Sequence, residues 1–109
     1  MANVFQRVHA ELTASLATIY TCPSSTQAIV IGLRYSNIDG TNSVNVEGKC
    51  GASGSTKYFN AKDTPVPAKG TFVGLEAGEK LVLEASEIFE AKASATGDCD
   101  IMMSILEIS

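Results

Sequence analysis

The stretch VNVEGKCGASGSTKYFN, residues 44–60, shows the pattern that decides the fold. Apolar and polar residues alternate as far as Cys50, a cluster of Gly, Ala and Ser follows, and aromatic residues come next. A phosphate-binding loop would require a helix after the small residues, because the N–H groups and dipole at a helix N-terminus bind the anion. The residues after Gly54 have no helical spacing and lead into two prolines. We therefore predict a hairpin, with Val44, Val46 and Cys50 on the core side of its first strand.

The most apolar segment, QAIVIGLRYSNI at residues 27–38, predicts a central strand. Strict alternation places one set of its side chains on one face, Ile29, Ile31, Leu33 and Tyr35, and the other set on the opposite face, Ala28, Val30, Gly32 and Arg34. Asp39–Gly40 follows and predicts a tight hairpin to the next strand. DTPVPAKG, residues 63–70, predicts an extended crossing or an edge segment, because proline donates no ladder hydrogen bond.

The closing third of the chain alternates as well. Phe89, Ala91, Ala93 and Ala95 share one face of their segment. In the last segment Ile101, Met103 and Ile105 occupy one face, and Met102, Leu106 and Ile108 occupy the other. A terminal strand that is apolar on both faces needs cover on both sides. We therefore predict that Met102, Leu106 and Ile108 form an interface with other copies of the chain.

About eight strands, with turn signals every 8 to 12 residues, are typical of an antiparallel sandwich. We predict a single all-β domain over residues 1–109, an antiparallel β-sandwich of the jelly-roll or Greek-key kind. Residues 1–15 are predicted as a strand followed by a loop, with an extended arm as a variant. The alternative is an amphipathic helix, since Val4, Val8, Leu12 and Leu16 recur at helical spacing.

Composition disfavours several partners. Twelve acidic residues against eight basic ones give a net charge of −4, which repels nucleic acid and anionic lipid. The longest apolar runs fall well short of the roughly 20 residues that a membrane helix needs. The amino terminus lacks the continuous apolar stretch of a signal peptide, so we expect synthesis in the cytoplasm.

The residues that carry chemistry are sparse. His9 is the single histidine, and the acidic residues are spread over turns and polar faces. GDCD, residues 97–100, is too short for a calcium loop of the EF-hand type. We therefore expect no catalytic residue, no cofactor and no metal site. A small enzyme with a cysteine–histidine pair would require His9 within hydrogen-bond reach of a thiol.

Cys22, Cys50 and Cys99 lie far apart and form no C-x-x-C pair, which disfavours a zinc knuckle or a redox motif. Two interpretations remain open. The thiols are buried or half-buried small hydrophobes in a reducing cytoplasm, or one or more of them form disulfides between subunits after release.

Several segments carry a family resemblance: MANVFQR at the start, TIYTCPSSTQAIVIGLRYSNIDGT (18–41), AKDTPVPAKGTFVGLEAGEKLVLEA (61–85) and DIMMSILEIS (100–109). Together they resemble small β-rich virion structural proteins of tailed bacteriophages, of the capsid-decoration or neck and collar type. The shared features are a T-x-Y-T-x-P turn, an apolar VIGL strand, a PVP crossing and a closing S-x-LEI. The chain departs from the group at EAS, residues 84–86, where a glycine turn is common.

The resemblance implies a non-enzymatic component of a virion, made in the host bacterial cytoplasm. We expect it to associate with itself as a trimer or higher cyclic oligomer, and to bind the major capsid protein as a decoration or cement protein, or the head–tail neck. The alternative is a receptor- or carbohydrate-binding module of a tail fibre or spike. That alternative requires Tyr20, Tyr35 or Tyr58 to be exposed together in a groove.

Overall fold

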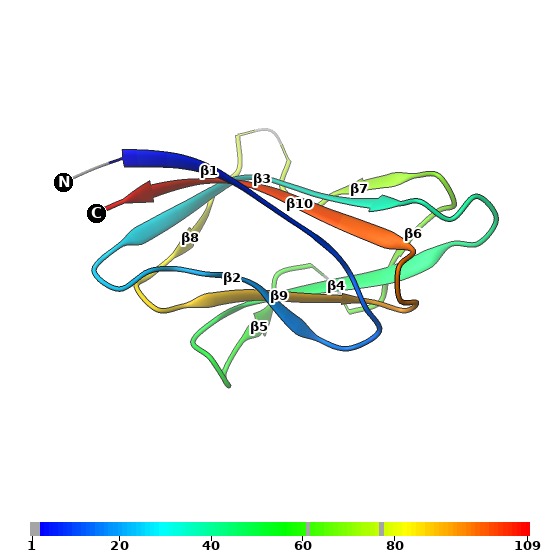
Figure 1. Cartoon of the computed structure of the whole chain (residues 1–109), viewed down its shortest axis with the longest axis horizontal. Helices are drawn as coiled ribbons and strands as arrows, with labels where there is room; N and C mark the ends of the chain where they lie inside the picture. The colour runs from blue at the N-terminus through cyan, green and yellow to red at the C-terminus, as the bar shows by residue number, and fades with distance from the viewer. Residues whose placement is uncertain (1–2, 61, 77) are drawn as a thin grey trace.

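A computed structural model describes residues 3–60, 62–76 and 78–109, and all the regular structure within these ranges is β-strand (Figure 1). The strands are β1 (Asn3–Glu11), β2 (Ala17–Thr21), β3 (Gln27–Asn37), β4 (Val44–Gly51), β5 (Lys57–Tyr58), β6 (Thr64–Val66), β7 (Thr71–Val73), β8 (Leu81–Leu83), β9 (Ile88–Ala93) and β10 (Cys99–Ile108). They form two antiparallel sheets packed face to face. The predicted all-β antiparallel sandwich is therefore confirmed.

Each sheet contains five strands. Sheet A has the order β1-β10-β3-β7, with β8 also pairing β3, and sheet B has the order β2-β9-β4-β5, with β6 also pairing β4. The short strands β7 and β8 pair with opposite ends of β3, and β5 and β6 pair with opposite ends of β4. Each of these two pairs is equivalent to one interrupted strand. Counted in that way, the ten strands agree with the predicted eight.

Most connections carry the chain from one sheet to the other. The predicted hairpin at residues 51–56 is confirmed, because β4 and β5 pair with each other and Ser55 N donates to Ala52 O at 2.9 Å. The hairpin predicted at Asp39–Gly40 is wrong, because β3 belongs to sheet A and β4 to sheet B. The Asp39 carboxylate still caps a turn there, accepting hydrogen bonds from Thr41 N at 2.8 Å and Asn42 N at 3.2 Å.

The opening segment is a strand followed by a loop, as predicted, and the helical alternative is wrong. β1 pairs with β10 along its whole length, from Asn3 opposite Ile108 to Glu11 opposite Asp100. The described residues of the opening segment are therefore tied to the chain's own sheet A. The extended arm as a variant for residues 1–15 stays a prediction.

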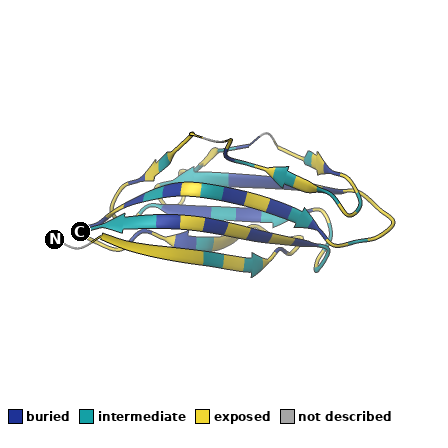
Figure 2. Ribbon diagram, turned by 90° about the horizontal axis from the view of Figure 1, so that it is seen from above, coloured by how far each residue is buried: buried dark blue, intermediate teal, exposed yellow. Residues whose placement is uncertain are grey.

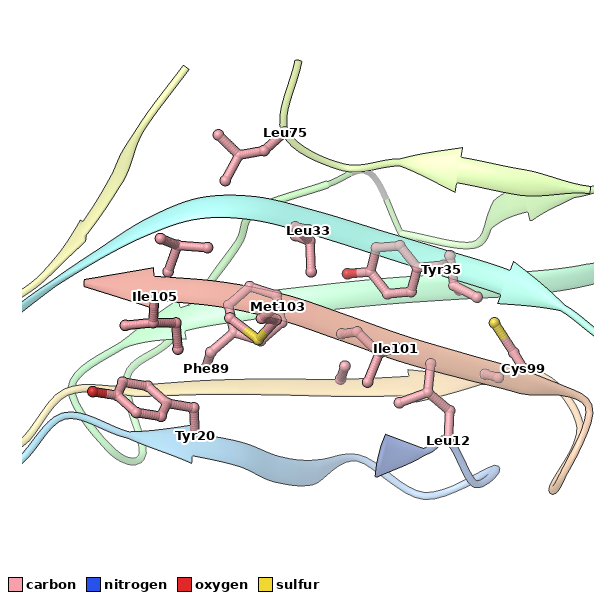
Figure 3. Close-up of a cluster of buried hydrophobic side chains, with 14 of the residues drawn as sticks. Leu12, Tyr20, Leu33, Tyr35, Leu75, Phe89, Cys99, Ile101, Met103 and Ile105 are labelled. Atoms are coloured by element: carbon pink, nitrogen blue, oxygen red, sulfur yellow. The ribbon is translucent and has the colours of Figure 1, made fainter. Parts of the chain in front are cut away.

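The core lies between the two sheets and takes its side chains from both (Figure 3). Ile101, Met103 and Ile105 of β10 are fully buried, as are Phe89, Ala91 and Ala93 of β9, which confirms the predicted core faces of both strands. Tyr35 stacks on Phe72 with ring centroids 5.8 Å apart. Its buried hydroxyl donates to Asn60 Oδ1 at 2.8 Å, so the phenol is satisfied inside the core.

The predicted face assignment of β3 is wrong over its first half. Ala28 and Val30 point into the core with Leu33 and Tyr35, whereas Ile29 is half-buried and Ile31 is 44% exposed. The reason is a β-bulge, because β10 pairs Ile105 with Val30 and Ser104 with Gly32, leaving Ile31 without a partner. One extra residue in a strand reverses the alternation beyond it.

Candidate interaction surface

The outer face of sheet A carries a row of apolar side chains that crosses four strands. Pairing places Phe5 of β1 opposite Leu106 of β10, Leu106 opposite Ile29 of β3, and Ile29 opposite Val82 of β8. We call these four residues the apolar row. Phe5 is 73% exposed and Val82 is 51% exposed, while Leu106 and Ile29 are half-buried. Figure 2 looks onto this face, with β1 along one edge and the short strands along the other.

Further apolar side chains extend the row on the same face. Ile31 projects from the bulge. Met102, which is 49% exposed, precedes Ser104 by two positions in β10. The predicted interface residues Met102, Leu106 and Ile108 therefore lie together on this outer face, Leu106 and Ile108 being half-buried. Their role as an interface stays a prediction. The sequence does not identify Phe5, Ile29 and Val82 as surface neighbours of Leu106. Only the strand pairing shows that the four residues lie in one row.

A hollow of about 380 Å³ lies beside the apolar row, lined by Gly32, Leu33, Arg34, Met102 and Ser104. It arises where Gly32 pairs with Ser104, since neither residue has a large side chain to fill the surface. A Cβ atom at Gly32 would lie 3.6 Å from the Ser104 side chain, which is ordinary contact. The hollow is therefore a gap in side-chain cover beside the β-bulge.

The outer face of sheet B is polar. Glu47 pairs with Lys92, and Lys49 pairs with Glu90, so opposite charges alternate across β4 and β9. Lys49 Nζ lies 5.0 Å from the centre of the Tyr58 ring on the neighbouring β5, a cation–π contact. Such a face needs no apolar partner, although Glu47 is only 5% exposed and its buried Oε1 has no hydrogen-bond partner among the described residues.

The three cysteines are free thiols in different settings. Cys22 and Cys99 are buried, and Cys50 is half-buried at the edge of the core. Burial raises the pKa of all three thiols; that of Cys99 reaches about 11, with the nearby Asp100 carboxylate adding to the effect. Cys50 is therefore the one of the three that another subunit can reach without opening the core.

The residues considered for chemistry do not come together. His9 lies on the outer face of sheet A opposite Met102, whereas Cys99 points into the core. Within the described ranges, no group of three or more His, Cys, Asp or Glu side chains is arranged to hold a metal ion. No helix among these residues is long and apolar enough to span a membrane.

The three tyrosines do not form the groove that a carbohydrate site would require. Tyr35 is fully buried and Tyr20 is 8% exposed, so Tyr58 alone presents its ring at the surface. The Tyr20 hydroxyl donates to the Glu107 carboxylate inside the end of the sandwich. Burial and this bond raise the pKa of Tyr20.

Comparison with known proteins shows a shared fold. No family model and no curated protein matches the sequence. Among solved structures, a chain in the acid-stable capsid of Helicobacter pylori bacteriophage KHP30 is similar, with a TM-score of 0.53 and 9% identity over 100% of this chain and 94% of that one. A chain in the disulfide-linked pili that form Bacillus endospore appendages has a TM-score of 0.51 and 14% identity over 99% of this chain and 87% of that one.

Proposed function

We propose that this chain is a non-enzymatic structural component of a tailed-phage virion, which associates with its own copies and binds a larger assembly. The observation that carries the proposal is the exposed apolar row of sheet A. Large apolar side chains that line up across a whole sheet face mark a surface for association. The fold shared with a chain of a phage capsid, over nearly all of both chains, supports the same class of function.

The connectivity supports a jelly roll in particular. When β5 with β6 and β7 with β8 are each counted as one strand, successive strands alternate between the two sheets except at the hairpin from β4 to β5, where both strands lie in sheet B. The first strand lies beside the last in sheet A, and the second lies beside the last but one in sheet B. Two interleaved Greek keys give this order, and viral capsid domains are among the proteins that use it.

Within the virion, we propose binding to the capsid surface as a decoration or cement protein, or to the head–tail neck. The acidic surface keeps the chain away from packaged nucleic acid. The assembly into trimers or higher rings remains a prediction.

The test is the location of the chain in purified particles. Quantitative mass spectrometry should find it in many copies per particle, and gold-labelled antibody should mark the capsid surface or the neck. A phage stock carrying Phe5→Lys together with Val82→Lys is expected to lose the chain from its particles, whereas Lys92→Ala on sheet B should retain it. Complete absence of the wild-type chain from purified particles would reject the proposed function.

A disulfide between subunits through Cys22, Cys50 or Cys99 is a separate proposal, and the greater exposure of Cys50 favours that residue. Non-reducing electrophoresis of intact particles should show a dimer band that disappears in a Cys50→Ser variant. A band at monomer size alone would mean that the thiols stay reduced in the virion.

A further inference from the structure

We propose that two copies of this chain pair face to face through the outer surfaces of their A sheets, related by a two-fold axis that runs parallel to the strands between β10 and β3. The inference rests on the proposed self-association and names its surface and geometry.

The apolar row matches itself under this rotation. Its four members occupy successive strands in the order Phe5, Leu106, Ile29 and Val82, so the line between β10 and β3 divides it into halves. Rotation about that line sets Phe5 of one copy on Val82 of the other, and Leu106 on Ile29. Each of the four apolar groups then meets an apolar group, which is what an isologous contact requires.

Charges at the two edges of sheet A match in the same arrangement. Arg7 pairs with Ser104 and therefore lies at the level of Gly32, on the β1 edge. The opposite edge at this level is the connection between β7 and β8, since Gly74 N bonds Leu33 O at 2.9 Å and Leu81 pairs with Val30. That connection carries the exposed residues Glu76, Glu79 and Lys80, a net charge of −1. The rotation brings Arg7 of each copy to the acidic edge of the other.

The B sheet of a second copy fits the apolar row poorly. Its outer face presents Lys49, Glu90 and Lys92, which would lose water against Phe5 and Leu106 without gaining partners. Burying such charges without compensation is strongly unfavourable. The apolar row carries no charge, whereas Arg34 and His9 lie on the same face at the level of Met102, so the A sheet suits another A sheet at the level of the row.

The size of the face is also adequate. Four strands at a spacing of about 4.8 Å and a length of roughly 33 Å for β10 give a flat area of about 600 Å². Specific interfaces bury about 800 Å² of accessible surface on each partner, and side-chain relief makes accessible area larger than flat area.

Site-directed cross-linking tests the geometry. In a Cys50→Ser background, purified Phe5→Cys and Val82→Cys proteins are mixed and treated with a short bismaleimide. The mixture should give a cross-linked dimer containing one copy of each variant, at least ten times more than either variant alone. The reason is that Phe5 residues of paired copies are separated by three strand spacings, about 14 Å. Phe5→Cys mixed with Lys92→Cys is the matched control and should give background cross-linking.

A charge exchange provides the second measurement. Arg7→Glu should weaken the dimer at least tenfold in sedimentation equilibrium, and Arg7→Glu combined with Glu76→Arg and Glu79→Arg should restore it. Circular dichroism checks that each variant folds, which is expected because all three side chains are exposed.

Equal cross-linking in the mixture and in the single variants, or a dimer that Arg7→Glu leaves unchanged, would overturn the pairing. A chain that is found in particles but shows no Phe5–Val82 cross-link would retain the proposed function and lose this geometry. A specific cross-link in a chain that is absent from particles would support this geometry and reject the proposed function.

Discussion

The inner faces of both sheets form the core of the sandwich, whereas their outer faces differ in polarity. Inside, both supply fully buried side chains, Ile105 and Met103 from sheet A and Phe89 and Ala91 from sheet B. Outside, sheet A presents the apolar row, whereas sheet B presents alternating lysine and glutamate. Because the inner faces already provide the core, the most exposed side chains of the row, Phe5 and Val82, add little to the stability of one copy. The contrast therefore separates the residues that form the core from those available for the proposed association.

The largest effect is expected in the shared core. Phe89→Ala should lower the free energy of unfolding by about 3–5 kcal/mol, and Ile105→Ala by about 2–5 kcal/mol, because each leaves a cavity between the sheets. Urea denaturation measures both. If one of the two substitutions cost less than 1 kcal/mol, the sheets would not contribute equally to the core.

A pair of glycines should distinguish the inner face of sheet B from the outer face of sheet A. A Cβ atom on Gly48 would approach Asn60 Oδ1 and Phe89 Cζ to 2.8 Å, too close for either side chain. Gly48→Ala should therefore cost about 1–3 kcal/mol. Gly32→Ala, which faces the outer hollow, should change stability by less than about 0.5 kcal/mol. Thermal unfolding of the two variants compares them, and a costly Gly32→Ala would mean that the hollow is part of the packed core.

Alkaline pH should lower the stability of the fold through ionisable groups that are buried between the sheets, such as the Cys99 thiol. An unfolded cysteine ionises near pH 9, whereas the pKa of folded Cys99 is raised to about 11, mainly by burial. Above pH 9 the unfolded chain therefore binds fewer protons than the folded chain, and stability falls by about 1.4 kcal/mol per pH unit for one such group. Below pH 9 this contribution is constant. Denaturation between pH 8 and 11 should show a shallower decline in Cys99→Ala, and an identical slope would mean that the thiol ionises normally in the fold.

The smallest effects on stability are expected on the outer faces. Lys49→Ala removes the contact with the Tyr58 ring and should cost about 0.5–1 kcal/mol without changing the oligomeric state. Val82→Ser should change the stability of the monomer by about 0.5 kcal/mol or less, yet reduce self-association. Light scattering after size exclusion measures the association. The reverse result, in which Lys49→Ala dissociates the protein and Val82→Ser does not, would move the interface to sheet B.

Much of the fold was predictable because alternation is a local signal. The core faces of β9 and β10 follow directly from their sequences, and so does the turn between β4 and β5. The signal failed at Ile31, because a bulge shifts the alternation there; the isolated Gly32 beside it is the local sign of such a bulge. It failed again at Asp39–Gly40, since turn residues specify a reversal of the chain and do not specify which sheet receives the next strand.

The candidate surface was predictable only in part. Met102, Leu106 and Ile108 belong to one strand, so their shared face could be read along the chain. Phe5, Ile29 and Val82 belong to three strands, and their alignment with Leu106 depends on pairing between distant segments. Val82 in particular lies in a strand of three apolar residues, where sequence alone does not indicate which one faces outward.

The pairing of Asn3 with Ile108 has a practical consequence for engineering the protein. The start of β1 and the end of β10 therefore lie side by side at one end of the sandwich (Figure 1). A short glycine–serine bridge could join them, and new ends could be opened in the exposed turn at residues 52–55. Such a circular permutant would display a fused cargo beside β5, on the side of the molecule away from Phe5.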